Sequence, residues 1–103
     1  MPAPPPERSA ALLVVAGAVA DDAAVRALCD RLRAVIATTD AQVIAVDVRD
    51  LPATCRSIEA LARLALTARR SRRRIRLRRA SPALEQLLDF AGLASVLPTA
   101  ALD

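Results

Sequence analysis

Short runs of apolar residues alternate along this chain with longer segments in which apolar residues recur every three or four positions. Residues 11–16 and 42–48 are two such runs, rich in aliphatic side chains, and their length is typical of buried strands. Residues 75–78 alternate strictly between an apolar residue and arginine, which is typical of a strand with one buried and one solvated face. The pattern therefore predicts three strands separated by helical segments.

Polar residues and a proline mark where the helices should begin. Asp21 and Asp22 provide an N-cap for a first helix, and residues 54–70 should form a second. A serine–proline pair at residues 81–82 is a strong start signal for a third helix, which Gly92 should end. The positions expected on the inner faces of these helices are Val25, Leu28, Cys29, Leu32, Val35 and Ile36, then Ile58, Leu61, Leu64, Ala65 and Ala68, and finally Leu84, Leu87, Leu88 and Ala91.

Strands and helices that alternate in this way predict an α/β fold. We expect a mostly parallel sheet of three to four strands. The helices should pack mainly on one face, because strands in sequential order place their crossovers on the same side. The domain should span residues 10–97, with a disordered, proline-rich tail over residues 1–9 and a C-terminal tail over residues 98–103.

The composition argues against an enzyme. The 103 residues include 15 basic residues, all of them arginine, against 11 acidic residues, and there is no histidine. Without histidine the chain lacks the commonest general base and the commonest metal ligand, so Ser-His-Asp sites and histidine-bearing zinc sites are excluded. Cys29 and Cys55 form no Cys-x-x-Cys pair, and we expect both to be reduced structural thiols. We therefore expect no catalytic residues, no metal and no cofactor.

The apolar segments also bear on the cellular compartment. No run approaches the roughly 18 apolar residues that a membrane span requires, so no transmembrane segment is expected. Residues 10–20 end in Ala-Val-Ala and imitate a signal-peptide cleavage site, but three consecutive prolines and a glutamate precede them. Cleavage there would also remove the first strand. We therefore expect a cytoplasmic protein.

Residues 81–93 carry the most specific motif in the chain. They read serine, proline, leucines at helical spacing, and then Ala91, Gly92 and Leu93. This segment resembles the closing helix of the STAS domain, the fold of bacterial anti-sigma-factor antagonists and of regulatory modules on transporters. Gly17 after the first strand and Asp47 near the end of the second also stand where that family places them. The resemblance covers about residues 11–97 and implies a non-enzymatic bacterial signalling protein that binds a partner protein.

The start of the second helix departs from the family motif. Typical antagonists carry Asp-Ser-Ser-Gly there, and a kinase-type anti-sigma factor phosphorylates one of the serines. The corresponding residues here are Cys55, Arg56, Ser57 and Ile58, so the resemblance implies Ser57 as the phosphoacceptor of a degenerate motif. A phosphate there would be stabilised by the helix dipole and by Arg56. The alternative is that Ser57 or Thr54 only caps the helix.

The resemblance also implies which surface meets the partner, namely the start of the second helix and the loop before it. The residues expected in contact are Asp50, Pro52, Thr54, Cys55, Arg56, Ser57, Ile58 and Glu59. The partner would be an anti-sigma factor with serine-kinase activity. Because the motif is degenerate, the alternative is a constitutive partner such as the ATPase of a phospholipid-transport ABC system, which MlaB-type STAS subunits bind.

The first, antiparallel strand of the family has no counterpart in the sequence pattern, since only a proline-rich segment precedes Leu12. A sheet without that strand would have an unpaired edge. An unpaired edge favours a homodimer or the addition of a strand from a partner.

Arginines concentrate in one third of the chain. Residues 56–79 hold ten arginines and one glutamate, a net charge of +9, whereas the other residues sum to −5. Three interpretations remain open: a solvated face, a docking surface for an acidic protein, or a module that binds nucleic acid or an anionic membrane. No specific nucleic acid is expected, because stacking aromatics and a helix-turn-helix pattern are absent. The basic patch consists of Arg69, Arg70, Arg72, Arg73, Arg74, Arg76, Arg78 and Arg79.

Overall fold

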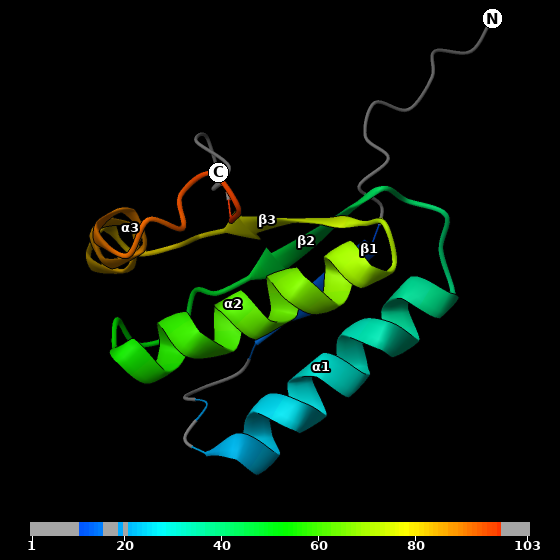
Figure 1. Ribbon diagram of the computed structural model, residues 1–103, viewed down its shortest axis with the longest axis horizontal. Coiled ribbons are helices and arrows are strands. Elements are labelled where there is room, and N and C mark those ends of the chain that lie inside the picture. Colours follow the sequence, from blue (N-terminus) through cyan, green and yellow to red (C-terminus); the bar gives the residue numbers. More distant parts are fainter. Residues whose placement is uncertain (1–10, 16–18, 20, 98–103) are drawn as a thin grey trace, which may run out of the picture.

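The protein folds around a three-stranded parallel sheet with its strands in chain order (Figure 1). The computed structural model describes residues 11–15, 19 and 21–97. The strands are β1 (Ala11–Val14), β2 (Val43–Asp47) and β3 (Arg74–Arg78), and the helices are α1 (Asp22–Ala37), α2 (Cys55–Arg70) and α3 (Pro82–Phe90). The predicted α/β class and the order of its elements are confirmed. The predicted tails and Gly17 lie outside the described residues.

Helices α1 and α2 lie side by side on one face of the sheet, and α3 follows β3 beyond the carboxyl end of that strand (Figure 1). The first two helices are the crossovers between parallel neighbours, so the sequential strand order places both on the same face. Helix α3 is not a crossover and is held by Leu84 and Leu88, which reach the common core. No helix within the described ranges is both long enough and apolar enough to cross a membrane.

The core is aliphatic and lies between the sheet and the two crossover helices. The strand residues that face the helices are Leu13, Ile44, Val46, Ile75 and Leu77, each at most 3% exposed. They pack in one cluster with Leu32 of α1 and Leu61 and Leu64 of α2, all fully buried. Phe90, the single aromatic residue, is 90% exposed and takes no part in the core. Branched aliphatic side chains therefore provide the apolar burial that holds the layers together.

Of the predicted inner-face positions, one needs correction and four are only half-buried. The half-buried positions are Val35, Ile36, Ile58 and Leu87. Ala91 is exposed, because α3 ends at Phe90 and Ala91 forms its C-cap. Gly92 follows with a φ of +77°, the left-handed conformation that ends helices and that glycine adopts without a Cβ clash.

The other face of the sheet has no helix on it among the described elements. Leu12 and Val14 of β1 are 48% and 39% exposed there, and Arg74 and Arg76 of β3 are exposed on the same face, across β2. This arrangement confirms the predicted strand with one buried and one solvated face. At the outer edge of β1, the Val14 carbonyl oxygen accepts a hydrogen bond from Nη2 of Arg31 at 3.0 Å. One acceptor that an added strand would need is therefore already occupied, and a dimer through this edge stays a prediction.

Removing the hydroxyl of Ser81 should destabilise the protein by about 1 kcal/mol, because this side chain is the N-cap of α3. Its Oγ accepts the Leu84 N–H at 3.1 Å, and Pro82 follows in the first turn, as predicted. Urea denaturation of Ser81→Ala would measure the change. The matched control is Ser71→Ala, because Ser71 is exposed and caps α2 through its backbone N–H alone. Equal stabilities of the two variants would contradict the role of Ser81.

Candidate partner-binding site

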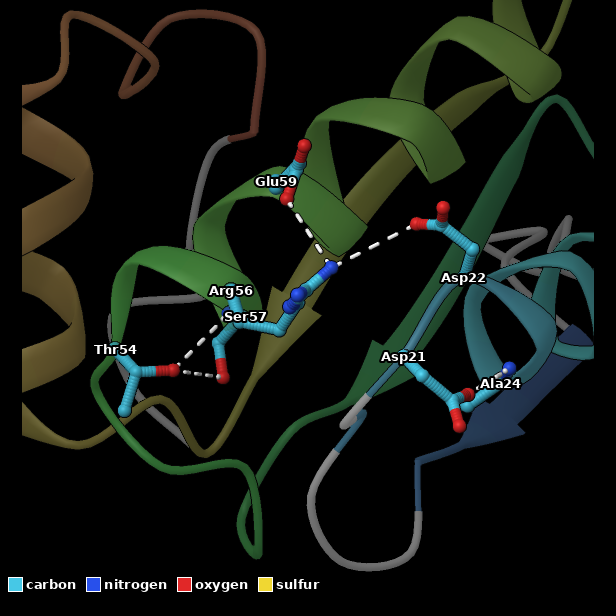
Figure 2. A network of polar contacts seen from close by, with 7 residues as sticks. All are labelled: Asp21, Asp22, Ala24, Thr54, Arg56, Ser57 and Glu59. Carbon is cyan, nitrogen blue, oxygen red and sulfur yellow. Dashed lines mark hydrogen bonds and ion pairs between the residues drawn. The ribbon is translucent and has the colours of Figure 1, made fainter.

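The predicted partner surface lies at the end of the sheet where the strands have their carboxyl ends. In a parallel sheet each strand leads into its helix at this same end, so α1 and α2 both begin here. The loop over residues 48–54 connects β2 to α2 and passes the same edge. The charged and hydroxyl groups of both helix starts therefore gather in one place, which Figure 2 shows at close range.

Thr54 is the residue that caps α2. Its Oγ1 accepts the Ser57 N–H at 3.1 Å and also donates a hydrogen bond to Oγ of Ser57 at 3.1 Å (Figure 2). Thr54 is exposed, whereas Ser57 is fully buried at 0% exposure. A kinase would therefore reach Oγ of Ser57 only after the first turn of α2 had opened. That Ser57 is a phosphoacceptor stays a prediction, and the capping role belongs to Thr54.

Arg56 connects the starts of the two crossover helices. Its Nη1 lies 3.6 Å from Oδ1 of Asp22 in α1 and 3.8 Å from Oε1 of Glu59 in α2 (Figure 2). All three side chains are about half exposed or more, so each ion pair contributes well under about 1 kcal/mol. Asp21 caps α1 through the Ala24 N–H at 2.8 Å. These residues form a mixed-charge surface that spans the starts of α1 and α2.

Most of the predicted contact residues are accessible to a partner. The exposed residues are Asp50, Pro52, Thr54, Cys55, Arg56 and Glu59, while Ile58 is half-buried and Ser57 is buried. Asp22 belongs to this surface but was not among the predicted residues. Its link to α2 follows from the parallel topology, which places the N-termini of consecutive helices at the same sheet edge.

Both cysteines are free thiols, in different surroundings. Cys29 is buried at 7% exposure on the inner face of α1, as predicted. Cys55 is exposed because the first position of α2 faces solvent, so the expectation of a structural thiol is wrong there.

Asp47 anchors the loop that carries part of this surface. It ends β2 at 7% exposure, and its Oδ1 accepts the Arg49 N–H at 3.0 Å. Its Oδ2 lies 3.9 Å from Nη2 of Arg49 and 3.8 Å from Nε of Arg79, which directly follows β3. The carboxylate thus links the ends of two strands to Arg49 in the loop. Asp47 lies at the end of the second strand, as expected, but its partners were not predicted from the sequence.

The eight arginines of the predicted basic patch differ in their surroundings. Arg69, Arg70 and Arg72 are exposed at the end of α2 and in the turn after it, and Arg74 and Arg76 are exposed on β3. The other three, which are Arg73, Arg78 and Arg79, are engaged with other parts of the protein. The partly buried Arg73 donates to two backbone carbonyls of the α1–β2 loop. Part of the net charge of +9 is therefore engaged in contacts within the protein.

Comparison with known proteins supports a fold assignment. No family model and no curated protein matches the sequence. Among solved structures, the chain resembles a sulfate transporter family protein from Wolinella succinogenes, with a TM-score of 0.62 at 17% identity over 87% of this chain and 72% of the other. It also resembles the anti-sigma factor antagonist SpoIIAA in its unphosphorylated form, with a TM-score of 0.59 at 16% identity over 88% of this chain and 79% of the other. The protein therefore has the fold of a STAS domain.

Proposed function

We propose that this protein is a non-enzymatic regulatory module of the bacterial cytoplasm that binds a partner protein through the start of α2, in the manner of an anti-sigma-factor antagonist. The observation that carries the proposal is the exposed, mixed-charge surface built around Arg56, on a fold shared with SpoIIAA. Charged residues on such a surface direct the approach and orientation of a partner more than they determine its affinity.

The burial of Ser57 favours a partner that is bound without a phosphorylation cycle. Its hydroxyl is enclosed by the first turn of α2 and bonded to the cap, so the folded protein does not offer it to a kinase. The degenerate motif, with Cys55 and Ile58 beside it, agrees with this interpretation. We therefore propose that binding is constitutive and that the interface is the exposed part of the helix start.

A binding experiment with two classes of partner tests the proposal. The purified chain is titrated separately with a kinase-type anti-sigma factor and with the ATPase subunit of a phospholipid-transport ABC system, each encoded in the same genome. Arg56→Ala should weaken the complex with the true partner by about tenfold, because interface arginines are frequent hot spots. The control is Arg70→Ala, which removes the same charge from an exposed position at the opposite end of α2.

The outcomes separate the candidate partners. Binding of the anti-sigma factor that depends on Arg56 would support the proposal as stated. Binding of the ATPase alone, with the same dependence, would keep the partner-binding surface but replace the anti-sigma role with an accessory role in lipid transport. Equal losses for Arg56→Ala and Arg70→Ala, or binding of neither protein, would contradict the proposed surface.

A further inference from the structure

A cleft lined by arginines lies at the opposite end of α2 from the proposed partner surface. It has a volume of about 550 Å³ and opens between the last turns of α2, the first residues of β3 and the segment after α3. Its polar lining consists of Gln42, Arg69, Arg72, Arg73, Arg74 and Ser95. The other described residues that line it are apolar, and none of the described lining residues is acidic. Its size is that of a small-molecule site, and its charge selects for anions.

The base of this cleft is held in place by Arg73. Nη1 of this residue donates to the carbonyl oxygens of Thr39 at 2.9 Å and of Ala41 at 2.8 Å, which fastens the α2–β3 turn to the loop before β2. The Arg74 N–H donates to the Gln42 carbonyl oxygen at 2.8 Å and closes the same junction. The arginines around the cleft therefore project from a braced backbone.

Arg72 occupies a backbone position that usually belongs to glycine. Helix α2 ends in a Schellman motif, in which the Arg73 N–H bonds to the Ala68 carbonyl at 2.8 Å and the Arg72 N–H to the Arg69 carbonyl at 2.9 Å. Arg72 has a φ of 60°, in the left-handed region where a Cβ atom is strained. A glycine would satisfy the motif without this strain. The side chain of Arg72 is thus present at a cost in stability, and strain of this kind is concentrated at functional sites.

The charges around the cleft lack protein counter-charges. Within the described part of the chain, the guanidinium groups of Arg69, Arg72 and Arg74 make no hydrogen bond and no ion pair. The helix dipole favours Arg69 at the end of α2, but Arg72 and Arg74 lie beyond that end. Several like charges around one cleft repel one another, and a bound polyanion would remove that repulsion.

We infer that this cleft binds a small ligand that carries two or more phosphate groups. Guanidinium groups bind phosphate oxygens through two parallel hydrogen bonds, and three guanidinium groups around a cleft suit more than one phosphate. The apolar residues Ala65, Ile75 and Val96 add a surface for the organic part of such a ligand. The phosphates could belong to a soluble metabolite or to the headgroup of a lipid with two phosphates, and the chemistry of recognition is the same.

Calorimetric titration of the full chain with inorganic pyrophosphate tests the inference, and Arg72→Gly is the informative variant. This substitution should raise the dissociation constant about tenfold. It should also raise the melting temperature by about 2–8 °C, because it relieves the left-handed strain. Weaker binding by a more stable protein excludes unfolding as the cause. The control is Arg26→Gln, which lowers the net charge equally on exposed α1 and should change the dissociation constant less than about twofold.

Two further binding measurements, with vesicles and with duplex DNA, identify the source of the phosphates and test the inference against its alternatives. Preference for phosphatidylcholine vesicles containing cardiolipin over plain vesicles would assign a lipid headgroup, whereas binding of pyrophosphate without that preference would assign a soluble ligand. Absence of saturable pyrophosphate binding, or equal weakening by Arg26→Gln and Arg72→Gly, would overturn the inference. Duplex DNA that binds regardless of Arg72 and is not displaced by pyrophosphate would overturn it as well, in favour of a diffuse polyanion surface.

Discussion

Replacing Ser57 with aspartate is expected to destabilise the protein by about 2–4 kcal/mol rather than to imitate a regulatory phosphate. The reason is that Ser57 is fully buried, and its Oγ is already bonded to Oγ1 of Thr54. A carboxylate in this position would be larger than the hydroxyl and would be shielded from water. The positive end of the α2 dipole would offset only part of that penalty. Urea denaturation followed by circular dichroism would measure the loss.

A neighbouring substitution provides the control for charge at the start of this helix. Thr54→Asp places the same negative charge three residues earlier, on an exposed side chain. Aspartate is as good an N-cap as threonine, so the free energy of unfolding should change by less than about 0.5 kcal/mol. If Ser57→Asp proved as stable as Thr54→Asp, the hydroxyl of Ser57 would have to be accessible in solution. If Thr54→Asp lost partner binding and Ser57→Asp did not, charge at this surface would be able to act as a switch without Ser57.

The elements of the fold were predictable because their signals are local. The caps Asp21, Thr54 and Ser81 each bond to an N–H three residues ahead, so a short window of sequence contains the whole interaction. The strand of alternating isoleucine, leucine and arginine shows its two faces by its period alone. Local patterns of this kind determine where helices and strands begin and which faces they bury.

The roles of individual arginines were not predictable, because they depend on contacts between distant segments. Arg73 bonds to carbonyl oxygens 34 and 32 positions away, at Thr39 and Ala41. Eight of the eleven residues over 69–79 are arginine, so no composition rule distinguishes the inward Arg73 from the exposed Arg72. The two arginines are distinguished only by the contact that the α2–β3 turn makes with the loop before β2, because Arg73 alone of the two bonds to that loop.

The burial of Ser57 was in principle visible in the sequence. Ser57 lies on the same helical stripe as Ala60, Leu61, Leu64 and Ala68, all of which are buried. Spacings of three and four residues place it on the face that the apolar residues define. The sequence analysis did not place Ser57 on the inner face, because a serine near a helix start is usually interpreted as a cap. Helical phase, rather than residue type, was the informative signal.

Replacing Asp47 with alanine is the second change for which we expect a large effect, a loss of about 2–3 kcal/mol. The main contribution is the charge-assisted hydrogen bond from the Arg49 N–H to Oδ1 at 3.0 Å, which would lose its acceptor. The two ion pairs add little, because they are 3.8 and 3.9 Å long and the guanidinium groups of Arg79 and Arg49 are more than half exposed. Chemical denaturation would measure the loss, with exposed Asp50→Ala as the matched control.

The same substitution connects stability to the partner surface, because Asp47 holds the beginning of the loop that leads to α2. In Asp47→Ala the amides of residues 49–53 should exchange with deuterium faster than in the unmodified protein, while those in the middle of α1 should change only with global stability. Asp47→Asn retains an acceptor for the Arg49 N–H and should lose only about 1 kcal/mol with little change in loop exchange. If Asp47→Asn were as damaging as Asp47→Ala, the ion pairs with Arg49 and Arg79, rather than the hydrogen bond, would be what positions the loop.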